Sequence, residues 1–101
     1  QQDYLPSLEF SPEPDIIRFE QIVVAENARR ALSNAEIIDA VKRHATGDWG
    51  EAELEDRAAN ERALACKGRL CSVFRSHTGI RFYAITQADH HTTTILVPAE
   101  Y

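Results

Sequence analysis

Two short segments carry side chains that could support acid–base chemistry. In the first, Asp89, His90 and His91 precede a run of three threonines, Thr92–Thr94. Neutral imidazole is available as a proton acceptor near pH 7. If these residues begin a strand, neighbouring side chains point to opposite faces of the sheet, so the two histidines would not converge on one substrate atom. A polar turn followed by a threonine-rich strand is the alternative interpretation.

His44 is the second candidate, because it stands four residues before Asp48 and a histidine oriented by a carboxylate is half of a nucleophilic device. No serine or cysteine is tied to this pair by spacing. A histidine on an apolar helix face is more often a core residue with satisfied hydrogen bonds. Trp49 follows directly, between Gly47 and Gly50. We expect His44, Asp48 and Trp49 to serve as a structural or partner-binding anchor, with the indole either covering the end of a helical layer or contacting a partner.

The cysteines and histidines do not form a metal-binding pattern. Cys66 and Cys71 lie five residues apart, and His77, His90 and His91 show no ligand spacing. We therefore expect neither a metal nor another cofactor. We expect both thiols to be buried and reduced, which favours a cytoplasmic location.

Charge is distributed unevenly along the 101 residues, whose formal net charge is −5. Residues 67–88 contain four basic residues and no acid, and Arg69, Arg75 and Arg81 among them could form a local anion patch. The alternative is solvating charge on an exposed hairpin. The acidic remainder disfavours a nucleic-acid partner, because such binding grows with the number of phosphates neutralised by clustered cations. Short apolar runs and the lack of a basic-then-apolar leader argue against a membrane segment.

Periodicity predicts one α+β domain over residues 16–101, preceded by an extended, proline-containing arm at residues 1–15. The predicted order is strand, two to three helices, then a three-stranded antiparallel meander. The predicted elements are a strand at Ile16–Val24, a helical turn at Glu26–Leu32, helices at Asn34–Ala45 and Glu53–Cys66, and strands at Arg69–Arg75, Ile80–Thr86 and Thr92–Val97.

The helix at Asn34–Ala45 has the clearest signal. Ser33 and Glu36 resemble a capping box at its start. Ile37, Ile38 and Val41 fall on one arc of the helix, together with His44 and Ala45. We expect the side chains of Ile37, Ile38 and Val41 to pack against the sheet. Glu53–Cys66 favours a helix by composition, but its apolar residues are spread around the axis and predict no buried face.

From His44 onward, the chain resembles a family of small uncharacterised bacterial proteins that are often found on plasmids and other mobile elements. Their labels include "plasmid-related protein" and "type I restriction subunit". The residues that carry the resemblance are His44, Gly47-Asp48-Trp49-Gly50, Asp56, Asn60, Ala63-Leu64, Arg69-Leu70, Ser72, Gly79, Phe82, Ile85-Thr86, Asp89, Thr93-Thr94-Ile95-Leu96-Val97-Pro98 and Tyr101. The chain departs from the family at His90, where an arginine is usual, at Gln87, where an acid is usual, and at Tyr83, where a tryptophan is frequent. The resemblance implies a mobile-element association and no particular chemistry.

Two functions from different classes stay open. The first is a noncatalytic binding or regulatory protein that contacts another protein, of unknown oligomeric state. The second is a metal-independent ribonuclease similar to the barnase-like and RelE-like toxins, with Arg69, Arg81, His90 and Thr94 as its catalytic candidates. Convergence of those four residues on one concave face would favour the ribonuclease.

Overall fold

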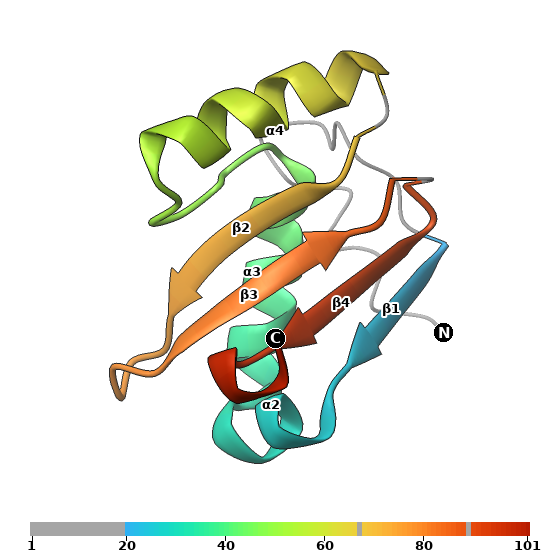
Figure 1. Cartoon of the computed structure of the whole chain (residues 1–101). Helices are drawn as coiled ribbons and strands as arrows, with labels where there is room; N and C mark the ends of the chain where they lie inside the picture. The colour runs from blue at the N-terminus through green and yellow to red at the C-terminus, as the bar shows by residue number, and fades with distance from the viewer. Residues whose placement is uncertain (1–19, 67, 89) are drawn as a thin grey trace.

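The computed structural model describes residues 20–66, 68–88 and 90–101 and has the predicted α+β fold (Figure 1). Strand, helices and strands follow one another in the predicted order. The elements are β1 (Gln21–Val24), α2 (Glu26–Ala31), α3 (Asn34–Ala45), α4 (Leu54–Cys66), β2 (Leu70–Arg75), β3 (Arg81–Thr86), β4 (Thr92–Leu96) and the 3-10 turn η1 (Pro98–Glu100). The predicted arm at residues 1–15 and the first residues of the predicted Ile16–Val24 strand lie outside the described residues.

The sheet is mixed and has the strand order β1-β4-β3-β2. Strands β2, β3 and β4 form the predicted antiparallel meander, whereas β1 pairs in parallel with β4, Ile22 lying opposite Thr93. A parallel pair needs a long crossover connection, which the intervening helices and the β2–β3 hairpin supply. Within the described residues, no helix has the length and apolar character that crossing a bilayer requires.

Helix α3 crosses behind the sheet and begins with the predicted capping box (Figure 1). Ser33 Oγ accepts a hydrogen bond from the Glu36 N–H at 3.1 Å, and a Glu36 carboxylate oxygen accepts one from the Ser33 N–H at 2.9 Å. Ile37 is buried and Val41 is half-buried, as expected, but the prediction for Ile38 is wrong. The Ile38 side chain is 54% exposed, because it lies on a flank of the helix beyond the part that the sheet covers.

The main core fills the space between the sheet and α2 and α3. Its buried members are Ala28, Leu32, Ile37, Ala40, Phe74, Phe82, Ala84, Ile95 and Val97. A second cluster, formed by Trp49, Ala52, Ala63 and Leu70, attaches α4 to the β2 side of the sheet. The prediction that both thiols are buried is wrong for Cys66, which is exposed near the end of α4, while Cys71 is half-buried.

The outer edge of β2 is closed by the loop before α4. Val73 N–H donates to the Trp49 carbonyl at 3.1 Å, and the Val73 carbonyl accepts from the Glu51 N–H at 2.6 Å. Gly50 lies between them with a φ of 65°, and a Cβ at this position would stand 2.0 Å from the Val73 carbonyl oxygen. The close approach of two backbones therefore requires glycine here.

Asn60 continues this edge with its side chain. Its amide Nδ2 donates to the Cys71 carbonyl at 2.8 Å, and its Oδ1 accepts from the Cys71 N–H at 3.0 Å. The amide thus bonds to Cys71 as a neighbouring strand would. This contact explains how α4 docks without a broad apolar face.

We predict that Asn60→Ala lowers the free energy of unfolding by about 1 to 3 kcal/mol, because it leaves a partly buried N–H and carbonyl of Cys71 without partners. Asn60→Asp keeps the acceptor but buries a carboxylate whose second oxygen faces the Cys71 carbonyl oxygen, so it should cost at least as much as the alanine variant. Urea unfolding measures both. An Asn60→Ala variant within about 0.5 kcal/mol of the parent would contradict this role.

Candidate functional site

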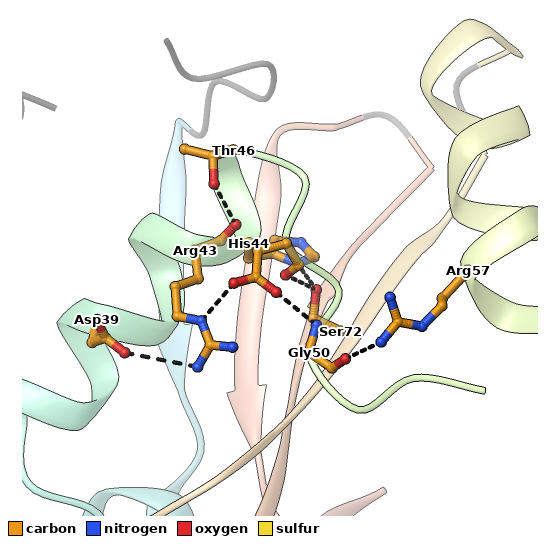
Figure 2. A network of polar contacts seen from close by, with 8 residues as sticks. Asp39, Arg43, His44, Thr46, Gly50, Arg57 and Ser72 are labelled. Carbon is orange, nitrogen blue, oxygen red and sulfur yellow. Dashed lines mark hydrogen bonds and ion pairs between the residues drawn. The ribbon is translucent and has the colours of Figure 1, made fainter. Parts of the chain in front are cut away.

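A buried chain of polar side chains connects α3 to the three antiparallel strands. His44 Nδ1 lies 2.5 Å from Ser72 Oγ of β2, and His44 Nε2 lies 2.8 Å from Thr86 Oγ1 of β3. Thr86 Oγ1 lies in turn 2.7 Å from Thr93 Oγ1 of β4. Figure 2 shows His44 and Ser72 pointing toward each other from helix and sheet. We call His44, Ser72, Thr86 and Thr93 the histidine chain; all four side chains are fully buried.

The environment of His44 keeps its imidazole neutral. Burial lowers the pKa of His44 from 6.5 to about 4, because a charged ring would lose its hydration in the core. A neutral ring donates at one nitrogen and accepts at the other. Ser72 Oγ donates to the Asp48 carbonyl at 3.4 Å, which directs the His44 Nδ1–H toward the serine oxygen and leaves Nε2 to accept from Thr86.

Trp49 packs directly against this ring. The two ring centroids are 5.8 Å apart in an edge-to-face arrangement, and the Trp49 side chain is 4% exposed. Its indole N–H donates to a Glu61 carboxylate oxygen of α4 at 2.8 Å. The indole therefore links α4 to the end of α3 from inside the fold.

The carboxylate of Asp48 interacts with cations and backbone rather than completing a nucleophilic device. It lies 2.8 Å from Arg43 Nε and accepts from the Gly50 N–H at 3.0 Å. The hydrogen bond from Arg43 is the main reason that the pKa of Asp48 is lowered. Arg43 also lies over the Phe74 ring, 4.6 Å from its centroid. Arg57 donates to the Gly50 carbonyl. Asp48 and Arg57 therefore both hold the backbone of Gly50 in place by hydrogen bonds.

The four ribonuclease candidates do not converge on one site. Arg69 precedes β2, and its Nη2 donates to the Tyr101 hydroxyl at 2.6 Å. His90 Nε2 lies 2.8 Å from the Gly68 carbonyl oxygen. Arg81 begins β3 at the other end of the hairpin, opposite Arg75 and about 17 Å along the strand from the Arg69 end. Thr94 lies in mid-strand opposite Ile85.

The predicted anion patch is divided in the same way. Arg75 pairs with both carboxylate oxygens of Glu51, at 3.0 and 3.3 Å, and this pairing lowers the pKa of the Glu51 carboxyl. Arg69 contacts Tyr101, at the opposite end of β2. The three arginines thus do not form one concave basic surface.

Sequence reasoning singled out His44 but missed its hydroxyl partners. Ser72, Thr86 and Thr93 share the inward-facing side of the sheet with Phe74, Phe82 and Ile95, so their signal was a small polar residue at an apolar strand position. Among the described residues, no group of three or more histidine, cysteine, aspartate or glutamate side chains could hold a metal ion.

The comparisons with known proteins found no matching family model, no matching curated protein and no matching solved structure.

We predict that stability falls as the pH drops from 6.5 to 4. The unfolded chain binds a proton at His44 below about pH 6.5, whereas the folded chain binds it only near pH 4. The contribution of the neutral ring is therefore complete above 6.5 and is lost toward 4, a change of about 3 kcal/mol. Urea unfolding at several pH values in this window measures it.

The matched controls for this pH dependence are His44→Gln and His91→Gln. The first should be less stable than the parent at pH 7.5 and should lose most of the slope, since the titrating ring is gone. The second replaces an exposed histidine that is paired with Glu20 and should keep the steep slope. Equal slopes in the parent and in His44→Gln would mean that other groups cause the acid sensitivity.

Proposed function

We propose that the chain is a noncatalytic binding or regulatory protein that acts by contacting another protein. In keeping with its family resemblance, we propose that it works in the bacterial cytoplasm and is associated with mobile elements. The observation that carries the proposal is the burial of the histidine chain. The imidazole best placed for catalysis is neutral, fully buried and hydrogen-bonded to Ser72 and Thr86.

Exposed tyrosine and arginine side chains on the face of the sheet opposite α3 support the proposed protein contact. Tyr101 is 68% exposed, and its ring centroid lies 5.2 Å from that of Tyr83 on β3. The Arg69 guanidinium lies 5.5 Å from the Tyr101 ring centroid and bonds to its hydroxyl. Tyrosine and arginine contribute much of the binding energy at protein interfaces, and side chains held in place before binding lose less entropy. We call Arg69, Tyr83 and Tyr101 the tyrosine cluster.

A long-range contact keeps the tyrosine cluster in position. The Glu100 carboxylate, next to Tyr101, accepts from the Asn27 N–H of α2 at 2.7 Å and from the Val97 N–H at 3.2 Å. This bond also supplies a cap for α2, whose first residues have no side-chain cap of their own. The bond to Val97 caps the turn η1 itself, and the bond to Asn27 ties the turn to α2.

The alternative hypothesis, a metal-independent ribonuclease, has less support. Cleavage by general acid–base catalysis needs two titratable groups and a cation directed at one phosphate. Arg81 lies at the far end of the hairpin from Arg69, and His90 is engaged with the Gly68 carbonyl.

We predict that Tyr101→Ser weakens the complex with the protein partner at least tenfold, because it removes the exposed aromatic ring and the anchor for Arg69. The partner is first identified by cross-linking in the native host. It is then purified separately, without cross-linking, and titrated against each variant in a calorimeter. Leu54→Ser is the matched control, since Leu54 is an exposed apolar residue on α4. The control should bind like the parent.

Two results would contradict the proposed function. The first is unchanged affinity in a folded Tyr101→Ser variant, which would exclude the tyrosine cluster as the contact. The second is cleavage of labelled RNA at low salt by the purified parent, abolished by both His90→Ala and Arg81→Ala, which would establish the ribonuclease instead.

A further inference from the structure

One arginine on the face of the sheet opposite α3, which we call the outer face, is held in place without being paired to an acid. Arg69 is exposed, and its Nη2 donates to the Tyr101 hydroxyl at 2.6 Å. Its guanidinium carbon lies 5.5 Å from the centroid of the Tyr101 ring. Within residues 20–66, 68–88 and 90–101 it makes no ion pair, whereas Arg75 at the other end of β2 is paired with Glu51. Arg69 therefore keeps an unpaired positive charge in a restricted position.

The guanidinium of Arg69 still has donors to offer. A guanidinium carries five N–H donors, and Arg69 uses one of them, on Nη2, for its hydrogen bond to Tyr101. Its other donors bond to no residue of the part of the chain that the structure describes. Two parallel N–H groups of a guanidinium match the two oxygens of a carboxylate, and a charge-assisted pair of this kind is stronger than a neutral one. The ligand chemistry that fits Arg69 is therefore a carboxylate.

The strands around Arg69 present no acid on the outer face. Figure 1 shows η1 in front of this face, with α3 behind the sheet. Side chains alternate between the two faces along a strand, and the outward positions of β1 to β4 contain no aspartate or glutamate. Their charged side chains are Arg75, which is paired with Glu51, and Arg81. The strands of the outer face thus carry positive charge on a chain whose formal net charge is −5, and this favours an acidic occupant.

The spacing of the arginines favours a carboxylate over a phosphate. A phosphoryl group carries a charge of about −1.5 to −2 at pH 7, and proteins usually recognise it with clusters of arginines. Arg69 is separated from Arg75 and Arg81 by the length of the β2–β3 hairpin. A single guanidinium matches the single charge of a carboxylate. The same separation disfavours a nucleic acid, whose binding grows with the number of clustered cations.

The Tyr101 ring supplies an apolar surface beside the guanidinium. The Tyr101 side chain is 68% exposed, and its ring lies against that of Tyr83, with 5.2 Å between the centroids. An apolar residue next to the bound acid would lie on this ring and exclude water from the ion pair. An ion pair is stronger where water is excluded, so the ring and the guanidinium act together.

We propose that the tyrosine cluster binds an aspartate or glutamate side chain of the partner protein together with the apolar residue beside it. Arg69 holds the carboxylate through two N–H groups, and the exposed Tyr101 ring contacts the neighbouring apolar side chain. This inference rests on the proposed function, because it names the chemistry that the partner presents to the same cluster. It requires an acid in the partner, which an aromatic contact alone would not.

The test uses the full chain labelled with nitrogen-15 and ten-residue peptides with blocked ends. One peptide has a single glutamate between a leucine and a proline in a serine–glycine background, and the other two have glutamine or phosphoserine in its place. In an NMR titration to millimolar concentration, the glutamate peptide should shift the signals of the Arg69 Nε–H and of the Tyr101 amide. It should bind at least fivefold more tightly than the glutamine peptide, which cannot form the charge-assisted pair.

Two variants locate the contact. Arg69→Gln should bind the glutamate and the glutamine peptides equally, so that the changes in protein and peptide are not additive. Arg81→Gln is the matched control, because it removes an exposed arginine from the other end of the same hairpin. The control should keep the parent's preference for glutamate.

Three results would overturn this assignment of the partner's chemistry. The first is a parent that does not distinguish the glutamate from the glutamine peptide, including one that binds neither. The second is a preference for glutamate that Arg69→Gln keeps or that Arg81→Gln loses. The third is a phosphoserine peptide that binds more than tenfold more tightly than the glutamate peptide, which would assign the site to phosphate.

Titration with the purified partner separates this inference from the proposed function. The account expects both Tyr101→Ser and Arg69→Gln to weaken that complex. If Tyr101→Ser weakens it and Arg69→Gln does not, the proposed function stands and the acidic partner segment is wrong. If a folded Tyr101→Ser variant binds like the parent, the proposed contact itself is wrong.

Discussion

The position of α3 against the sheet depends on a buried imidazole that must find hydrogen-bond partners. His44 has no access to water, and an unsatisfied buried polar group costs about 1 to 3 kcal/mol. Ser72 and Thr86 satisfy its two nitrogens from adjacent strands, and Thr93 satisfies Thr86 in turn. Apolar packing alone tolerates small shifts of a helix over a sheet. A directed chain of hydrogen bonds does not, so the histidine chain fixes the register between the two layers.

The neighbouring features follow from that placement. Once His44 is fixed, the loop after α3 carries Trp49 against its ring and brings Gly50 to the edge of β2. The same loop leads into α4, which Asn60 and Glu61 attach to Cys71 and to the indole. One end of the molecule is therefore built from specific polar contacts. The margin at β1 has no comparable closure among the described residues, and exposed apolar side chains collect there.

Local signals in the sequence predicted the elements, and contacts between distant residues account for the rest. The capping box and turn residues were sufficient to locate α3 and the meander. The parallel pairing of β1 with β4 was not predictable, because strand order is not encoded in local periodicity. The apolar arc of α3 included Ile38 because periodicity does not show where the covering sheet ends. His44 bonds to residues 28 and 42 positions away, and Asn60 acts through one amide, so neither contact has a pattern in sequence.

The histidine chain makes the most chemically suggestive residue of the protein part of its architecture, and the proposed protein contact is accordingly assigned to surface residues. That account depends on a neutral His44 with its proton on Nδ1. A nitrogen-15 NMR titration of the histidine rings tests it directly. The His44 ring should show the Nδ1–H tautomer at neutral pH and stay uncharged until about pH 4. Titration of His44 near pH 6.5 would show that the ring is accessible to solvent and would contradict the account.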